Sequence, residues 1–461
     1  MDTFQLRNAV NKLPQLRIGF YPTPFHALPN LSAVYGVNFF MKREDLAGPG
    51  AVSGSKTRLA EFILGRAAED GITHVITQGV YLTNSGLQFA AACRVAGITP
   101  ILFLTRDASR HGEIEEYRGN LLLNKAMDVE THFFTTDGGA YWDSEQDMAR
   151  IKNAMEDRKQ ELEAAGHRVL IVPTGGAHHA GFAAHAMTFM EILEQSQAAG
   201  IELDFIYHTI GTGTALPGML AAKLALGHPV RFRSIAICGY NDTDWMNPGI
   251  IVDRTKNVLA ALGADIPDDD TIHAEIDVDQ RFIGEDYAVP SPESTAAIRE
   301  LARHQGIFVG PVYTGKGLAG VLDHARTGQI PPGSNVAFIH TGDTGNLFEI
   351  AKVAGDITGR RLSRQRHVCW AAPNTCCRAM RPAAARPGGA TLSQVGFRCA
   401  RCLWHSPDCA VGRSAGLAAG LVSGSSGWRT GRRAVPAAAG LDGVRPAAGW
   451  WQAGRGQGAR R

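Results

Sequence analysis

Lys56 stands in a segment whose residue types suit covalent chemistry. Residues 53–58 read SGSKTR, and the spacing of apolar residues that follows predicts a helix beginning at this lysine. Helix N-termini favour negative charge, so a lysine there tends to lose its proton and become nucleophilic. Imine formation with an aldehyde cofactor requires such an amine. A solvated surface lysine would show the same pattern, so this segment alone leaves both interpretations open.

A second candidate site follows a predicted strand at residues 77–86, which read TQGVYLTNSG. The strand runs into a turn of hydroxyl and amide residues, and a helix is predicted to follow. Exposed backbone N–H groups in such a turn suit a carboxylate. Thr83, Asn84 and Ser85 are therefore candidates for substrate binding, although Thr83 or Asn84 could simply cap the helix.

A glycine- and threonine-rich segment at residues 207–214 reads YHTIGTGT. Gly211 and Gly213 would let backbone N–H groups approach phosphate oxygens, and the hydroxyls of Thr212 and Thr214 add donors. The segment has neither the lysine of a P-loop nor the full spacing of a dinucleotide fingerprint. A phosphate site and an ordinary glycine-rich turn both remain open.

Further turns carry candidate side chains. Tyr287 and Tyr313 each lie in a turn before a predicted helix, although buried tyrosines usually only pack with the hydroxyl hydrogen-bonded. Residues 338–345 end a predicted strand with small polar residues, against which a cofactor ring could rest. We assign the adjacent His178 and His179 to capping or packing, because neighbouring side chains point apart. The chain has no HExxH motif, and we expect no metal.

Alternating strand and helix patterns separate these segments. The expected strands are Val37–Lys42, His74–Thr77, Pro100–Leu104, Arg168–Val172, Phe205–Thr209, Ser234–Cys238 and Asn335–His340. The expected helices include Lys56–Asp70, Asn84–Ala96, Asp147–Ala165, Ala180–Ala198, Pro217–Leu226, Pro292–Gln305 and Lys316–Arg326. This alternation predicts an α/β protein with parallel sheets. Ligands of such folds bind at the carboxyl ends of the strands.

The composition is that of an ordinary globular protein, with 461 residues, of which 44% are hydrophobic and 20% charged. No apolar run reaches the roughly 18 residues of a membrane-spanning helix. The first twenty residues lack the apolar core of a signal peptide, so we expect a cytoplasmic protein without membrane contact. Before residue 364 the only cysteines are Cys93 and Cys238, which indicates a reducing compartment.

The composition changes sharply near residue 362. From Arg364 onward the chain has 15 Arg, no Lys and two acidic residues, so this stretch carries a formal charge of +13 and the rest carries −11. An acidic body argues against nucleic-acid binding. For residues 362–461 we expect an unfolded tail, either natural or translated from a shifted reading frame, with a folded module as the third interpretation. Cys399 and Cys402 lack the clean second pair of a zinc site.

In colinear order these segments resemble the family of D-cysteine desulfhydrase and 1-aminocyclopropane-1-carboxylate (ACC) deaminase. That family belongs to the tryptophan synthase β-like, fold type II group of pyridoxal-phosphate enzymes. The matching motifs, within roughly residues 15–355, are PTP at 22–24, KREDL at 42–46, GSKTR at 54–58, TN at 83–84, TGG at 174–176, PVYTGK at 311–316 and HTG at 340–342. Several ordered matches are far more specific than any one of them.

The resemblance implies that pyridoxal 5'-phosphate binds in the cleft between two three-layer domains with mainly parallel sheets. The large domain would comprise residues 1–52 and 162–361, and the smaller domain residues 53–161. Carried over by position, Lys56 is the Schiff-base lysine. The other implied positions are Thr83, Tyr287 and Tyr313 for catalysis, and Asn84, Thr314 and Thr341 beside the cofactor.

Thr314 and Thr341 stand where the two activities of the family differ. The deaminase typically has Glu and Leu at these places, whereas the desulfhydrase has small hydroxyl residues. A carboxylate near the pyridine nitrogen would keep that nitrogen protonated and strengthen the electron sink. A hydroxyl leaves a milder sink, which suffices when the β-substituent is a good leaving group such as a thiol. The resemblance therefore favours desulfhydration.

Four positions depart from the family pattern. Leu59 replaces a basic residue that is common three positions after the Schiff-base lysine. Leu82 and Ser85 replace an amide and an imidazole in the second segment, and Asp343 replaces a small residue near the ring. These changes affect the expected substrate more than the expected cofactor.

We therefore expect a pyridoxal-phosphate lyase that performs α,β-elimination on a small amino acid. With D-cysteine the products would be pyruvate, ammonia and hydrogen sulfide. The alternatives are ACC deaminase, another lyase or racemase acting on a β-substituted amino acid, and a catalytically inactive homologue that binds small molecules. The resemblance also suggests a homodimer.

Overall fold

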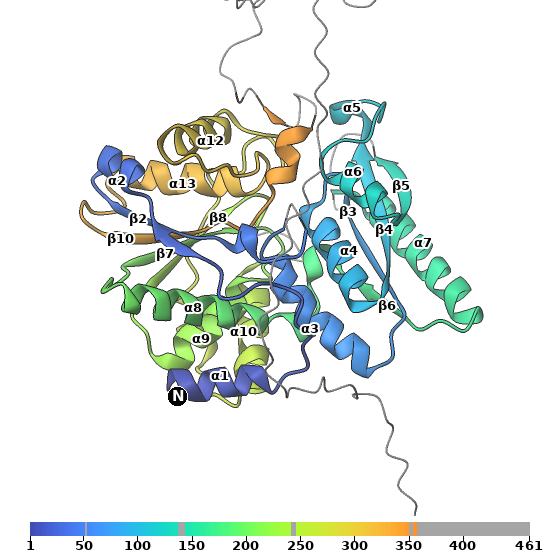
Figure 1. Ribbon diagram of the computed structural model, residues 1–461, viewed down its shortest axis with the longest axis horizontal. Helices are drawn as coiled ribbons and strands as arrows, with labels where there is room; N and C mark the ends of the chain where they lie inside the picture. Colours follow the sequence, from blue (N-terminus) through green and yellow to red (C-terminus); the bar gives the residue numbers. More distant parts are fainter. Residues whose placement is uncertain (51–52, 137–142, 241–245, 350–353, 356, 358–461) are drawn as a thin grey trace, which may run out of the picture. The chain divides into compact units, whose positions relative to one another are not determined.

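Two β-sheets, each with helices on both faces, organise the chain (Figure 1). The computed structural model describes residues 1–357 except 51–52, 137–142, 241–245, 350–353 and 356. The predictions for the tail at residues 362–461, including its cysteine pair, lie outside the described residues. No helix in the described part of the chain is long and apolar enough to cross a membrane.

The larger sheet has six strands, and every neighbouring pair is parallel except β1 and β2. In spatial order its strands are β1 (Phe25–Ala27), β2 (Asn38–Lys42), β10 (Asn335–Ile339), β7 (Phe205–Ile210), β8 (Arg231–Ala236) and β9 (Val278–Asp279). Along β10, Val336 and Phe338 enter one apolar core, whereas Ala337 and Ile339 enter the core on the opposite face. Both faces are therefore buried, as is usual for parallel sheets.

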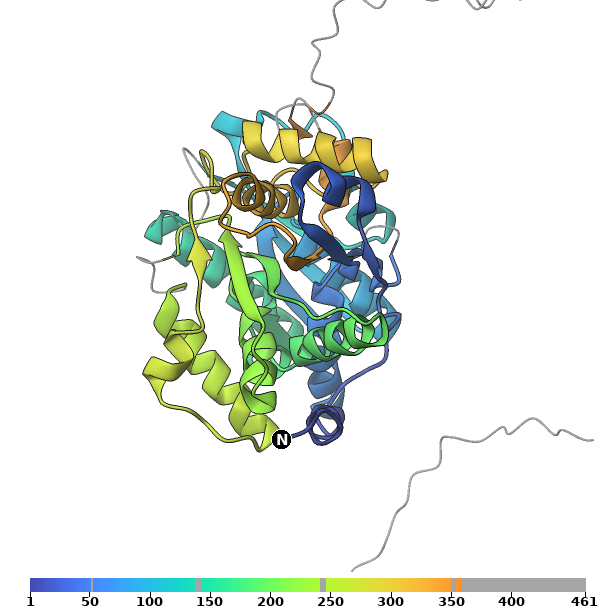
Figure 2. The same cartoon turned by 90° about the vertical axis from the view of Figure 1, so that its left-hand side faces the viewer.

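Helices cover both faces of the larger sheet (Figures 1 and 2). One face carries α2 (Pro29–Tyr35), α12 (Pro292–Gln305) and α13 (Thr314–Arg326). The other face carries α1 (Thr3–Asn11), α8 (Ala184–Ala198), α9 (Leu216–Leu226) and α10 (Pro248–Leu262), and the short α11 (Asp269–His273) follows α10. The sheet and its two helical coverings form the predicted three layers.

The smaller sheet has four parallel strands. In spatial order they are β5 (Glu130–Thr136), β4 (Thr99–Asp107), β3 (His74–Val80) and β6 (Val169–Val172). One face packs on α7 (Glu145–Ala164), and the other on α3 (Lys56–Glu69), α4 (Asn84–Ala96) and α6 (Gly119–Ala126), while α5 (Ala108–His111) follows β4. Single 3-10 turns are η1 (Glu44–Leu46), η3 (Thr174–Gly176), η4 (His179–Gly181) and η5 (Thr344–Phe348).

The predicted α/β class with mainly parallel sheets is confirmed. Each predicted strand and helix forms, with ends shifted by a few residues; the helix expected from Ala180 starts at Ala184 because η4 precedes it. Strand β6 lies beyond the predicted domain boundary at residue 161 but pairs with β3, so the smaller sheet reaches past that boundary. The division into two domains otherwise stays a prediction.

A buried network of ion pairs connects β2, η1, α3 and α8. Arg58 donates from Nε to Glu44 Oε2 and from Nη2 to Glu191 Oε2, each at 2.6 Å, and Lys42 Nζ donates to Glu191 Oε2 at 2.7 Å. All four side chains are at most 5% exposed. Burial alone would raise the pKa of Glu44, but Arg58 lowers it to about 2. The two cations and two carboxylates balance, so this burial is tolerated.

We expect Arg58→Met to lower the free energy of unfolding by about 3–5 kcal/mol, because it leaves two buried carboxylates without their shared cation. Arg66→Met on the same helix is the matched control. Arg66 pairs with Glu69 and Asp70 while its side chain is 53% exposed, so its loss should cost less than about 1 kcal/mol. Urea unfolding of both variants measures the difference. Equal losses would contradict the prediction.

Candidate active site

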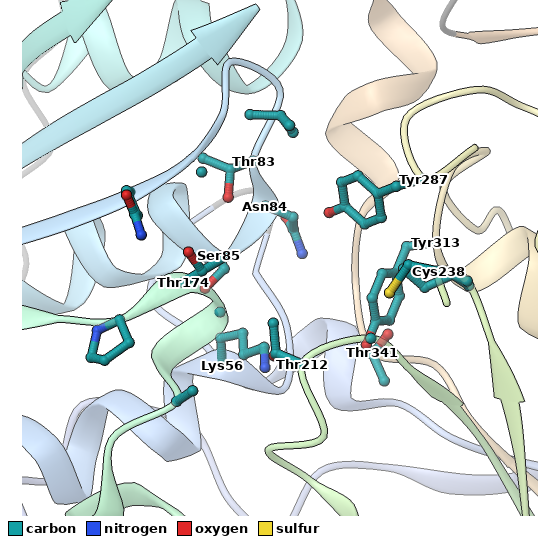
Figure 3. A pocket seen from close by; sticks show the side chains of 18 of the residues that line it. Lys56, Thr83, Asn84, Ser85, Thr174, Thr212, Cys238, Tyr287, Tyr313 and Thr341 are labelled. Atoms are coloured by element: carbon teal, nitrogen blue, oxygen red, sulfur yellow. The ribbon is translucent and has the colours of Figure 1, made fainter. Parts of the chain in front are cut away.

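Segments that follow the carboxyl ends of β3, β6, β7, β8 and β10 line one cavity of about 620 Å³ (Figure 3). This volume lies within the usual range for small-molecule sites. The cavity collects residues that are far apart in the sequence, among them Lys56, Thr83, Thr212, Tyr313 and Thr341. The prediction that ligands bind beyond the strand ends thus corresponds to a real cavity.

Lys56 is the first residue of α3 and faces this cavity (Figure 3). Its Nζ donates to the hydroxyl of Thr214. Burial, and secondarily the charge of Arg254, lowers the pKa of Lys56 to about 7. A large fraction of the amine is therefore neutral and nucleophilic at neutral pH. Of the two interpretations of Lys56, the structure supports the buried amine.

The backbone around Lys56 is held against the end of β10. Ser55 N donates to Thr341 O at 3.1 Å, and a Cβ at Gly54 would lie only 2.2 Å from the same oxygen. Any larger residue at position 54 would separate the two segments. This close approach explains the glycine two residues before the lysine.

The loop from Gly211 to Thr214 joins β7 to α9 beside Lys56. Gly211 and Thr212 line the cavity, whereas Gly213 and Thr214 are not among the lining residues. Gly213 adopts a φ of 58°, which favours glycine. Within the described part of the chain, no side chain caps the N-terminus of α9, which starts at Leu216. Its first N–H groups and the threonine hydroxyls suit an anion such as a phosphate.

Thr83, Asn84 and Ser85 all line the cavity at the N-terminus of α4. Thr83 also caps the helix, because its Oγ1 accepts a hydrogen bond from Gly86 N at 3.1 Å. Both interpretations of this turn are thus compatible: the hydroxyl accepts from the backbone and still has its own proton to donate. Asn84 Oδ1 is buried and has no hydrogen-bond partner among the described residues, so it is available to a ligand.

Thr341 lines the cavity, whereas Thr314 is fully buried behind it. The two hydroxyls are 3.0 Å apart, and Thr314 Oγ1 also donates to Gly342 O at 3.0 Å. The structure therefore brings the two threonines together but places only Thr341 in the wall. Asp343 also lines the cavity, and burial raises its pKa to about 8, so this acid is largely neutral at pH 7.

Tyr287 and Tyr313 line the same side of the cavity as Thr341, across from Thr83 (Figure 3). The Tyr313 hydroxyl donates to Thr209 O at 3.2 Å, and burial raises its pKa, so it stays protonated. Lys316 Nζ donates to Ile283 O and Asp286 O, each at 2.6 Å, and thereby supports the turn that carries Tyr287. Sequence reasoning had assigned no role to Lys316.

The histidine pair has the expected capping role, but its two side chains do not point apart as we expected from the sequence. His178 Nδ1 accepts from Ala180 N at 3.3 Å and caps η4, while the rings of His178 and His179 lie 4.4 Å apart. Across the described residues, no group of three or more His, Cys, Asp or Glu side chains could hold a metal ion. The capping prediction is therefore confirmed for His178.

Sequence reasoning missed several lining residues. Cys238, Lys152 and Arg254 contribute to the wall, yet none belongs to a motif that we singled out for chemistry. For Cys238 a signal existed, since it is the last residue of the predicted strand Ser234–Cys238 and lies just after the observed end of β8 at Ala236. The helix α10 that carries Arg254 also has a local signature, because Asn247 caps it and a proline follows. That signature predicts a helix but not its position at the cavity.

Comparisons with known proteins show what the chain is similar to. A family model described as "Pyridoxal-phosphate dependent enzyme" matches residues 16–342. The 1-aminocyclopropane-1-carboxylate deaminases of Rhizobium leguminosarum bv. viciae and Variovorax paradoxus (strain S110) are 29% and 28% identical over 336 residues, which cover 72% of this chain and 95% of each relative. A crystal structure of an ACC deaminase homologue is 28% identical, with a TM-score of 0.64, and covers 76% of this chain and 97% of that one.

In the cofactor-free protein, Lys56 should react with an amine-directed reagent at half its maximal rate near pH 7, because burial lowers its pKa. Lys256 is the control, since Asp269 raises its pKa and it should react only at far higher pH. Peptide mass spectrometry after labelling at each pH gives both curves. Identical curves for the two lysines would contradict the prediction.

Proposed function

Because the chain belongs to the family of pyridoxal-phosphate dependent enzymes, we propose that Lys56 holds the cofactor and that the enzyme eliminates a β-substituent from a small amino acid. The single observation that carries this proposal is the buried Lys56 amine, which faces the cavity beside the Gly211–Thr214 loop. D-cysteine is the proposed substrate, with pyruvate, ammonia and hydrogen sulfide as products.

The residues of the cavity fit pyridoxal phosphate. Lys56 supplies an amine that is about half neutral at pH 7, and the loop before α9 supplies N–H and hydroxyl donors for a phosphate. Asn84, whose Oδ1 has no partner among the described residues, and Thr341 supply polar groups for the ring. When bound, the cofactor provides an electron sink for negative charge at the substrate α-carbon.

We assign proton transfer and substrate binding to different side chains of this cavity. Lys56 Nζ would take the α-proton of the substrate, for which a pKa of about 7 is well matched at neutral pH. The turn from Thr83 to Ser85 holds the substrate carboxylate at the N-terminus of α4. Thr83, Tyr287 or Tyr313 relays a proton to the departing β-substituent, since a thiol leaves more readily when protonated.

Two observations support desulfhydration over ring opening. The hydroxyls of Thr314 and Thr341 contact each other, so these two positions carry no carboxylate. The nearby Asp343 has a pKa of about 8 and is largely neutral at pH 7. An environment without a carboxylate anion leaves a ring nitrogen less protonated, and a thiol is a good enough leaving group for that weaker sink.

ACC deamination is the second candidate, because the similar bacterial proteins carry that name. A lyase or racemase acting on another β-substituted amino acid is a further candidate, because Leu82, Ser85 and Asp343 depart from the family pattern. A catalytically inactive binding protein is the non-enzymatic alternative. The homodimer and the cytoplasmic location stay predictions from sequence, and light scattering of the purified protein measures the first of them.

The purified protein, supplied with pyridoxal phosphate, should release pyruvate, ammonia and hydrogen sulfide from D-cysteine and no 2-oxo acid from ACC. A screen of D- and L-amino acids for 2-oxo acid and ammonia release tests the substrate. Lys56→Ala should lower turnover at least about hundredfold, because the general base is lost. Borohydride reduction and peptide mapping should place the cofactor on Lys56.

The contrary outcomes are distinct. A 2-oxo acid from ACC and none from D-cysteine would establish the deaminase candidate instead. Cofactor bound at Lys56 without turnover of any amino acid would favour the binding protein. Label on a different lysine would overturn the proposed role of Lys56.

A further inference from the structure

We propose that Arg254 provides the positive charge that binds the phosphate group of pyridoxal phosphate, from a helix outside the Gly211–Thr214 loop. The inference rests on the proposed role of Lys56 and concerns another group of the cofactor, its phosphate ester. Arg254 lies on α10 and lines the same cavity as Lys56, Gly211 and Thr212.

The side chain of Arg254 is fixed against this loop. Its Nη1 donates to Thr212 O at 2.7 Å and to Gly213 O at 3.2 Å, and its guanidinium carbon lies 4.9 Å from the centroid of the Phe182 ring. Among the described residues, Nε and Nη2 have no hydrogen-bond acceptor. A guanidinium can bind the loop carbonyls with one nitrogen and an anion with another.

A phosphate ester needs such a charge. It carries roughly −1.5 to −2 at pH 7, whereas a helix N-terminus contributes only about half a positive charge. The N-terminus of α9 and the threonine hydroxyls therefore leave most of the negative charge uncompensated. A guanidinium at the loop supplies the missing charge and forms strong hydrogen bonds with phosphate oxygens.

The other cations near the cavity are unsuited to this role. Besides Arg254, the described residues that line the cavity include two lysines, Lys56 and Lys152. Lys56 is the proposed attachment point of the cofactor aldehyde. Lys152 is exposed on α7, which packs on the smaller sheet and not beside the loop after β7.

The helix that carries Lys56 offers no substitute. Arg58 already forms ion pairs with Glu44 and Glu191, so its charge is not free to neutralise a phosphate. One turn after Lys56, Leu59 is fully buried in an apolar cluster that includes Phe89. The cation must therefore come from another element, and α10 is the one that brings Arg254 to the loop.

The charge of Arg254 also acts on Lys56. After burial, Arg254 is the second cause that lowers the pKa of Lys56. In the cofactor-free protein, removing the charge should therefore raise the pKa of Lys56, and this can be measured without any turnover. This shift reports the charge of Arg254 near Lys56, whereas phosphate binding is measured separately by comparing ligands with and without the phosphate.

The decisive experiment titrates cofactor-free protein with pyridoxal phosphate and, separately, with pyridoxal, which lacks the phosphate. Arg254→Gln removes the charge but keeps amide donors for the loop carbonyls, and Arg254→Lys keeps a charge. Lys256→Met, on the exposed side of the same helix, is the control. Absorbance and fluorescence report binding, and circular dichroism with thermal unfolding checks that each variant folds.

We expect Arg254→Gln to weaken pyridoxal phosphate binding by about 10- to 100-fold, the usual effect of a charge-assisted hydrogen bond. Pyridoxal binding should stay within about twofold of the unaltered protein. Arg254→Lys should recover much of the affinity, and Lys256→Met should change neither ligand. The pH curve of Lys56 labelling should move upward in Arg254→Gln and stay nearly unchanged in Arg254→Lys.

An equal loss of affinity for pyridoxal phosphate and pyridoxal in Arg254→Gln would overturn the proposal, because the effect would not involve the phosphate. Unchanged affinity for both would overturn it as well. Failure of the Lys56 assignment is recognised separately, since borohydride would then label another lysine in the unaltered protein. The comparison of the two ligands keeps its meaning in that case.

Discussion

The buried ion network around Arg58 is the constraint on which the site depends. It joins the first turn of α3 to β2, η1 and α8, all at positions without access to water. Lys56 lies only two residues before Arg58 in that turn, so the ion pairs also restrict where its amine can lie. Ion pairs at this depth tolerate little displacement, because a separated charge would be left uncompensated in the interior. The flexible side chain of Lys56 is thus attached to a backbone segment that the ion pairs hold in place.

Burial determines the protonation states in the cavity, because it disfavours the charged form of both a base and an acid. It lowers the pKa of Lys56 to about 7 and raises that of Asp343 to about 8, so both groups tend toward their neutral forms at pH 7. A neutral amine can attack and accept protons. A protonated carboxyl group carries no negative charge, so it does not favour protonation of a nearby ring nitrogen. The same low-polarity surroundings therefore favour an amine that reacts and a mild electron sink.

The parallel sheets determine how distant segments meet. The turns after β3 and β7 and the end of β10 each arrive with small or hydroxyl residues, and Gly54 allows the lysine segment to lie against Thr341 O. Each segment by itself could be an ordinary turn or cap, as Thr83 demonstrates by capping α4 while it lines the cavity. Their convergence beyond the carboxyl ends of strands from both sheets combines several weak signals into one site.

The sequence by itself determined the order of strands and helices, because buried parallel strands are apolar runs and the helices between them show a helical spacing of apolar residues. It also indicated Lys56 and the Gly211–Thr214 loop as candidates, since their residue types are local and their order is specific. Only the tertiary structure decided that Thr314 lies behind Thr341 and that Arg254 holds a loop 42 residues away along the chain. Such roles arise from how elements pack on one another, and packing between distant segments leaves no periodic or local pattern in the chain.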